Sequence, residues 1–196
     1  MSAPDSKLVT PRQLSGALVA PPIQMRKLLR AHGASDDVLR EAVFEGSGRG
    51  LAVTRDVRAG EALVRLPASL IVTPAKARAA LGTSGLSNVE ALTCFLLSER
   101  ARGDASTWAS YISSIPEDFT FMPAHDEYPE GLRAALPPDV QRLMVAQRGL
   151  LNSDHEACKA SGVVSDPLLE RGIFQWAWFA VNTRCITYNG TLSHRR

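Results

Sequence analysis

The hydrophobic pattern of this chain changes near Pro74 from a strand period to a helical period. Between Gly50 and Thr73, apolar and polar residues alternate in short runs that are typical of β-strands. The expected strands begin at Leu51, Ala62 and Ser69. After Pro74 the apolar residues recur at helical spacing as far as Arg184. Strands followed by helices, without strand–helix–strand alternation, predict an α+β fold.

Glycines and polar residues mark where the expected turns and helices begin and end. The sequence predicts helices over Met25–Ala31, Pro74–Leu81, Asn88–Arg102, Pro138–Asn152 and Asp166–Arg184. Gly33 and Gly82 suit the left-handed residue that ends a helix. Asn88 and Asp166 are expected to cap the N-termini of their helices. Gly60 can take a positive φ in a turn over residues 56–61.

Composition excludes several classes of protein. The chain has 196 residues, 45% of them hydrophobic, which is enough for a buried core. The net charge of +2 creates no field toward nucleic acid or an anionic membrane. Its apolar runs are shorter than the roughly 20 residues that span a bilayer. We therefore expect neither direct nucleic-acid binding nor membrane insertion, and the charge does not name a partner.

Cysteine use and the N-terminal sequence bear on the compartment. Cys94, Cys158 and Cys185 are odd in number and widely separated, which argues against a disulfide framework and favours a reducing compartment. Residues 1–24 have no sustained apolar core and are expected to be a flexible lead-in, not a secretory signal. The expected location is cytoplasmic or nuclear, and organelle import stays open.

A glycine-rich loop, Gly46-Ser47-Gly48-Arg49-Gly50, enters the first expected strand. A dinucleotide-binding loop instead leaves a strand and enters a helix, and a phosphate loop needs Gly-Lys-Ser/Thr. The context therefore excludes both nucleotide motifs. Two interpretations stay open, because the glycines could let the backbone approach a small ligand or could simply let the chain turn.

The helix that ends at Arg184 carries the other candidate residues. The helix dipole favours a cation at this end, so Arg184 could be a capping or surface residue as well as a ligand-binding one. Trp176 and Trp178 are two residues apart and cannot share a helix face. We expect one to face the core and the other a groove or a neighbouring element, and we favour packing over an aromatic cage for methylated lysine.

The other polar groups in the sequence do not form a recognisable metal or catalytic site. His155 and Cys158, with Asp154 beside them, could place metal ligands on one helical face, but a zinc site needs about two more ligands. No metal site and no catalytic residue is predicted. The carboxylates of Asp126 and its neighbours are expected to lie on a solvated surface. The glycosylation sequon at Asn189 is expected to be incidental.

Four segments in order carry a resemblance to a known family. These are GSGRGLAVTRDVRAGEALVRLP, LIVTPAKARAALG, ALTCFLLSERARGDASTWASYISSIPEDF and FQWAWFAVNTR. Together they resemble the SET-domain protein methyltransferases of the Rubisco large-subunit methyltransferase type, over about residues 26–187. The resemblance implies S-adenosylmethionine as cofactor. Ser47, Gly48 and Arg49 match the loop that contacts this cofactor, and Arg184 matches an arginine that closes over it. Ser47 replaces an acidic residue that is common in the family, which weakens a side-chain contact there.

The resemblance also implies an organisation, an activity, and a protein substrate or protein partner. Residues 25–187 would be an incomplete SET domain, with the N-terminal flank and first SET strands over 25–75 and a helical insertion over 76–187. Residues 188–196 read as an unrelated tail. The Asn-His segment and later tyrosine of the family have no match here. We therefore expect the N-terminal fragment of a protein-lysine N-methyltransferase, inactive or weakly active as it stands. A non-catalytic protein-binding module is the alternative, and methylation of histidine also stays open.

Overall fold

The structure is a computed structural model that describes residues 28–34, 38–46 and 48–186. It divides into two compact units, the first ending at Ile71 and the second beginning at Val72. The expected lead-in over residues 1–24, the sequon at Asn189 and the expected tail over 188–196 lie outside the described residues. Within the described ranges, no helix combines the length and the apolar character needed to cross a membrane.

The first unit contains a two-stranded antiparallel sheet, β1 (Leu39–Phe44) and β2 (Gly48–Val53). The register pairs the two ends of the hairpin, Leu39 with Val53 and Phe44 with Gly48. One face is buried, because Ala42 and Ala52 are 1% and 7% exposed, whereas Leu51 on the other face is 63% exposed. The predicted strand at Leu51 is thus confirmed. Its partner β1 was not predicted, because LREAVF is rich in residues that also favour helices.

The strands predicted over 62–66 and 69–73 are wrong. Arg65 is a single bridge residue, and a 3-10 turn, η1 (Ala68–Leu70), occupies the start of the second run. Pro67 between the runs has no N–H to donate to a ladder. The apolar side chains of Leu63, Val64 and Leu66 are 37%, 43% and 49% exposed. Little apolar surface is therefore buried that would stabilise this run as a paired strand. The turn before them is confirmed, with φ of 83° at Gly60.

The second unit consists of helices and the loops that connect them. The helices are α2 (Pro74–Leu81), α3 (Asn88–Ala101), η2 (Gly103–Ala105), α4 (Ala109–Ile112), α5 (Glu130–Ala134), α6 (Pro138–Ser161), η3 (Asp166–Leu169) and α7 (Arg171–Arg184). The predicted ends of α2 are confirmed, with Gly82 at φ 68°. Ser87, not Asn88, caps α3, because Ser87 and Glu90 form a reciprocal capping box.

Two other helix ends differ from the predictions. The helix that was expected to stop at Asn152 continues to Ser161, because His155 and Cys158 extend its buried face, and it ends at Gly162 with φ 62°. Asp166 does not cap a long helix. It begins the turn η3, and the extended backbone of Glu170, with ψ of 138°, separates η3 from α7.

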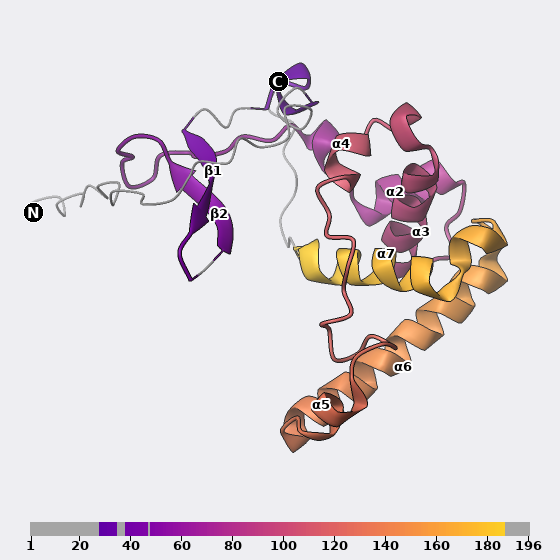
Figure 1. Cartoon of the computed structure of the whole chain (residues 1–196). Helices are drawn as coiled ribbons and strands as arrows, with labels where there is room; N and C mark the ends of the chain where they lie inside the picture. Colours follow the sequence, from indigo (N-terminus) through magenta and orange to yellow (C-terminus); the bar gives the residue numbers. More distant parts are fainter. Residues whose placement is uncertain (1–27, 35–37, 47, 187–196) are drawn as a thin grey trace, which may run out of the picture. The chain divides into compact units, whose positions relative to one another are not determined.

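The core of the second unit forms around α7, which contacts both α3 and α6 (Figure 1). Its residues Phe174, Trp178 and Phe179 are among the largest fully buried side chains, and Leu97 of α3 and Leu151 of α6 pack in the same cluster. Each such side chain contributes roughly 1.5–3 kcal/mol by leaving water. Core packing therefore holds α7 in place along most of its length, and Arg184 is its last residue.

Candidate functional site

The glycine-rich loop forms the turn of the β1–β2 hairpin. Gly46 has φ of 73°, which a side chain would strain, and the backbones of Gly48 and Arg49 begin β2. Ser47 lies outside the described residues. A Cβ at Gly50 would lie 3.0 Å from Cε2 of Phe44, so the Phe44 ring already covers this glycine. Packing of the Phe44 ring therefore explains why position 50 is a glycine, and the positive φ of the turn explains why position 46 is a glycine.

We expect Gly50→Ala to destabilise the hairpin, because the added methyl group crowds the Phe44 ring. Overpacking of this kind typically costs roughly 1–3 kcal/mol, and the low end applies here because a ring can shift. Faster amide hydrogen exchange in β1 and β2 would report the change. In a Phe44→Leu background the same substitution should have a smaller effect, and an equal effect in both backgrounds would contradict the explanation.

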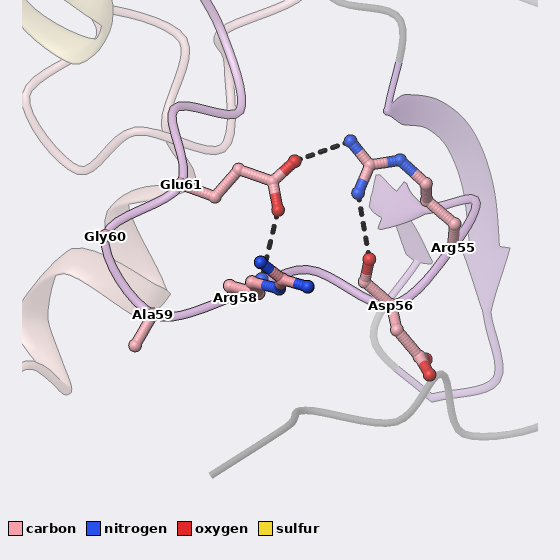
Figure 2. A pocket seen from close by; sticks show the side chains of 6 residues that line it. All are labelled: Arg55, Asp56, Arg58, Ala59, Gly60 and Glu61. Carbon is pink, nitrogen blue, oxygen red and sulfur yellow. Dashed lines mark hydrogen bonds and ion pairs between the residues drawn. The ribbon is translucent and has the colours of Figure 1, made fainter. Parts of the chain in front are cut away.

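Beyond β2 a surface hollow is lined by Arg55, Asp56 and residues 58–61 (Figure 2). A guanidinium N–H of Arg55 donates to the Glu61 carboxylate at 2.5 Å, and the backbone N–H of Arg58 donates to the same carboxylate at 3.0 Å. Hydrogen bonding from Arg55 lowers the pKa of Glu61. These polar groups hydrogen-bond to one another across the turn. The hollow therefore presents few unpaired polar groups to a ligand.

Arg184 lies exposed at the C-terminal end of α7. The neighbouring side chains turn back onto their own helix, since Asn182 donates to the Trp178 carbonyl and Thr183 to that of Phe179. Burial raises the pKa of the Tyr111 phenol, and the Arg184 charge opposes that rise, which places this cation near α4. Among the described residues Arg184 has no ion-pair partner, so its charge is available to an anion.

The predicted site residues are distributed over both units. Gly48 and Arg49 belong to the first unit and Arg184 to the second. A cofactor pocket shared by these residues stays a prediction.

Both tryptophans of α7 are buried, at 7% exposure for Trp176 and 2% for Trp178. The Trp176 indole N–H donates to the Pro116 carbonyl at 2.9 Å, and the Arg100 guanidinium lies 4.0 Å from the centre of its ring. The Trp178 indole N–H donates to the Asp154 carboxylate at 2.7 Å. Trp178 lies in the core and Trp176 contacts neighbouring segments, as expected, and the preference for packing over an aromatic cage is confirmed.

Asp154 carries a charge that the folded state disfavours. Burial raises its pKa, although the hydrogen bond from Trp178 opposes the rise. The folded pKa of Asp154 lies above the unfolded value of about 3.9, so its ionisation lowers the free energy of unfolding. The full penalty applies at pH values above the folded pKa. This penalty disappears as the pH falls below the unfolded value.

We therefore expect Asp154→Asn to stabilise the second unit at pH 7, because the amide oxygen can still accept from Trp178. The gain should shrink as the pH falls toward 4. Urea unfolding across this range measures it, with the same substitution at Asp139, whose side chain is 82% exposed, as the control. A gain that does not change with pH would argue against a charge effect.

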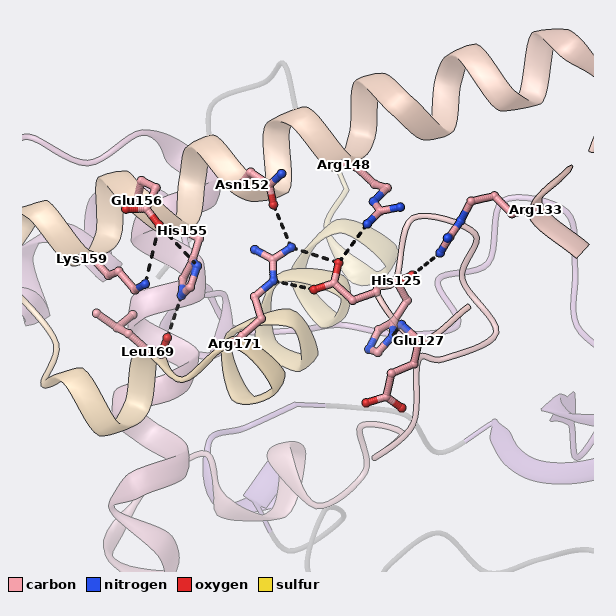
Figure 3. A network of polar contacts seen from close by, with 11 residues as sticks. His125, Glu127, Arg133, Arg148, Asn152, His155, Glu156, Lys159, Leu169 and Arg171 are labelled. Atoms are coloured by element: carbon pink, nitrogen blue, oxygen red, sulfur yellow. Dashed lines mark hydrogen bonds and ion pairs between the residues drawn. The ribbon is translucent and has the colours of Figure 1, made fainter. Parts of the chain in front are cut away.

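Polar contacts connect α6, α7 and the loop before α5 (Figure 3). Arg171 of α7 donates twice to the Asp126 carboxylate, at 2.8 and 3.2 Å, and once to Asn152 of α6 at 2.8 Å. Arg148 of α6 approaches Asp126 at 3.5 Å. The hydrogen bonds from Arg171 are the main reason that the pKa of Asp126 is lowered. Asp126 is exposed, as expected, and it also pairs with arginines of two helices.

His155 and Cys158 are both buried in the protein. The ring atom Nε2 of His155 lies 2.7 Å from the Leu169 carbonyl oxygen, and Cys158 belongs to the hydrophobic core. In the part of the chain that the structure describes, no three His, Cys, Asp or Glu side chains cluster as metal ligands. Sequence reasoning missed the pairing of Arg171 with Asp126, because residues so far apart give no local signal.

Comparisons with known proteins bear on the family. No family model matches the chain. SET domain-containing protein 4 of Mus musculus is 32% identical over 179 residues, which are 84% of this chain and 40% of that protein. The Homo sapiens protein of the same name is 30% identical over 179 residues, with the same coverage. The ribosomal lysine N-methyltransferase set11 of Schizosaccharomyces pombe is 24% identical over 77% of this chain and 38% of its own length.

The chain is thus similar in sequence to SET-domain proteins. The predicted resemblance is thereby confirmed, and two of these relatives carry the name SET domain-containing protein 4. The chain spans about two fifths of the length of the curated relatives it matches, at 40%, 40% and 38%.

Solved structures confirm the fold. The SET domain of LSMT bound to MeLysine and AdoHcy matches with a TM-score of 0.66 and 20% identity, over 82% of this chain and 39% of that one. Rubisco LSMT bound to sinefungin and monomethyllysine matches with the same score and identity, over 82% and 40%. The mixed arrangement of helices and a small sheet is thus a SET methyltransferase fold in partial form, as the α+β prediction expected.

Proposed function

We propose that this chain is the N-terminal portion of an S-adenosylmethionine-dependent protein-lysine N-methyltransferase. The observation that carries the proposal is the fold match to the Rubisco LSMT structures, which are bound to AdoHcy or sinefungin together with a methylated lysine. The order of the motifs along the sequence, from Gly46 to Arg184, supports the proposal. In this assignment residues 25–75 supply the N-terminal flank and first SET strands, and residues 76–187 are the helical insertion.

The proposed donor site consists of Ser47, Gly48 and Arg49 from the hairpin turn and Arg184 from α7. The described residues fit this cofactor in one respect, because Arg184 is exposed and has no ion-pair partner among them. Arginine binds carboxylates well through paired N–H donors, and the cofactor carries a carboxylate on its methionine part. When bound, the cofactor supplies an activated methyl group on a sulfonium.

Donor binding can be measured by calorimetric titration of the chain with S-adenosylmethionine. We expect Arg184→Ala to weaken binding at least about tenfold, in keeping with the loss of a charge-assisted contact. Arg142→Ala is the matched control, since Arg142 is an exposed arginine whose ion pair with Asp139 lies on α6. Equal effects of the two substitutions would contradict the proposed site.

Methyl transfer is a separate expectation. Transfer from a sulfonium to an amine requires the donor and a neutral amine to be held in line in a water-poor channel. The described part of the chain contributes a hairpin and a helical unit, and we propose that residues 1–196 alone transfer methyl groups slowly or not at all. Incubation with labelled cofactor and a protein mixture tests this, and hydrolysis of the product distinguishes methyllysine from methylhistidine. Rapid labelling would contradict the proposal.

A further inference from the structure

One face of α6 presents leucines that the second unit leaves exposed. The residues that α6 buries are Met144, Leu151, His155 and Cys158. Leu143 and Leu150 lie on another side of the helix and are 71% and 59% exposed. The first half of α6, which carries them, diverges from α7 (Figure 1). Between Leu143 and Ser153 the one charged residue is Arg148, which approaches Asp126 at 3.5 Å. This helix therefore has an uncharged apolar surface that the described part of its unit leaves largely uncovered.

Charges of opposite sign are placed symmetrically beside this surface. Arg142 precedes Gly149 by seven residues and Glu156 follows it by seven, which is close to two helical turns in each direction, so the three lie on one side of α6. The side chains of Arg142 and Glu156 are 77% and 74% exposed. Ala146 and Ser153, about one turn to either side of Gly149, are small and exposed, and a Cβ at Gly149 would meet open space. A second helix can therefore approach closely at Gly149, with one charge of each sign beside it.

We propose that this face binds a second copy of the chain, with α6 of each copy antiparallel to α6 of the other about a two-fold axis near Gly149. In this arrangement Leu150 meets Leu150 of the second copy beside the axis. Arg142 meets Glu156 of the second copy, and the symmetry repeats this contact at the other end of the interface. Within one copy Arg142 pairs with Asp139. An exposed pair of this kind contributes little to stability, so Arg142 can change its partner.

The symmetry of the charges favours a second copy over a different protein. An apolar helix face alone would fit any amphipathic helix. A second copy brings both a carboxylate for Arg142 and a guanidinium for Glu156, at matching distances from the axis. Glu156 lies 3.6 Å from Lys159 of its own helix and is still exposed, so it is accessible to this contact. One helix from each copy makes a small interface, so the association is weak and depends on concentration. The interface does not include Arg184 and is independent of the proposed donor site.

Sedimentation velocity of the full 196-residue chain over a series of concentrations measures the association. We expect a monomer–dimer equilibrium, which Leu150→Glu abolishes because it places two carboxylates at the axis. Leu132→Glu is the matched control, since Leu132 is also an exposed leucine, at 57%, but belongs to α5. A chain that is monomeric at every concentration would overturn the proposal. Slow alkylation of Leu150→Cys in such a monomer would show that another segment of the chain covers this face.

Charge reversal tests the pairing itself. Arg142→Glu and Glu156→Arg should each raise the dissociation constant of the dimer at least about tenfold, because each brings like charges together twice. The variant with both reversals should associate as the native chain does, a recovery that faulty folding could not produce. Circular dichroism checks that each variant keeps its helices. A dimer that Leu150→Glu leaves intact, or a double reversal that stays monomeric, would overturn the proposal.

Discussion

Replacement of Trp178 by alanine is expected to lower the free energy of unfolding of the second unit by about 3–5 kcal/mol. Trp178 is 2% exposed, and its ring packs edge-on to Phe179 with centroids 5.2 Å apart. The substitution leaves a large cavity at the centre of α7 and removes the donor that pairs with the half-buried Asp154. Both effects destabilise the folded state, since a cavity loses packing and a buried carboxylate loses its partner.

Phe121→Ala is the matched control for this experiment. Phe121 is also aromatic and also contacts another ring, that of Phe119 with centroids 6.1 Å apart, but it is 64% exposed. We expect its replacement to change stability by no more than about 0.5 kcal/mol, as is usual for surface positions. Urea unfolding followed by far-ultraviolet circular dichroism compares the two variants. Similar losses in both would show that α7 is not the centre of the core.

Local sequence signals predicted the helices well because their ends depend on nearby residues. The boundaries of α2 follow from Pro74 at its first turn and from Gly82, and both residues act through their own backbone geometry. The caps of α3 and α7 were predicted less well. Ser87 and Asn88 are adjacent residues that both favour a cap, and the reciprocal bond with Glu90 selects Ser87.

Strands were harder to predict because a strand exists only through its partner. β1 was missed although it pairs along its whole length with β2, and the apolar run at Ala62–Leu66 found no such partner in the sheet. Sequence alternation reports which residues could lie on a sheet face, whereas pairing depends on tertiary contacts. The two runs differ in burial, since Ala42 of β1 is 1% exposed and Leu66 is 49% exposed.

The candidate site shows the same division between local and distant effects. Arg184 was predicted from the motif at the end of its own helix, and its exposure agrees with a binding role. The ion pair of Arg171 with Asp126 and the hydrogen bond from Trp178 to Asp154 each join segments that are far apart in sequence. No spacing rule could predict these contacts, because they arise when α3, α6 and α7 pack together.

His155 gives the second large expected effect. Its side chain is 5% exposed, its Nε2 lies 2.7 Å from the Leu169 carbonyl oxygen, and its ring lies 4.6 Å from that of Phe174. The hydrogen bond fixes η3 against α6 immediately before α7 begins. His155→Ala removes both contacts and leaves the Leu169 carbonyl without this partner, so we expect a loss of roughly 2–4 kcal/mol in the free energy of unfolding.

Two comparisons separate the hydrogen bond of His155 from its packing. His155→Gln keeps an amide N–H that can donate to Leu169, and it should recover part of the stability lost in the alanine variant. His32 also places a ring nitrogen near a carbonyl, that of Leu28 at 3.0 Å, but it is exposed, so His32→Ala should have little effect. Urea unfolding of the three variants measures the differences. If glutamine and alanine at position 155 destabilise equally, ring packing and not the bond to Leu169 holds the start of α7, because the glutamine variant retains the donor and lacks only the ring.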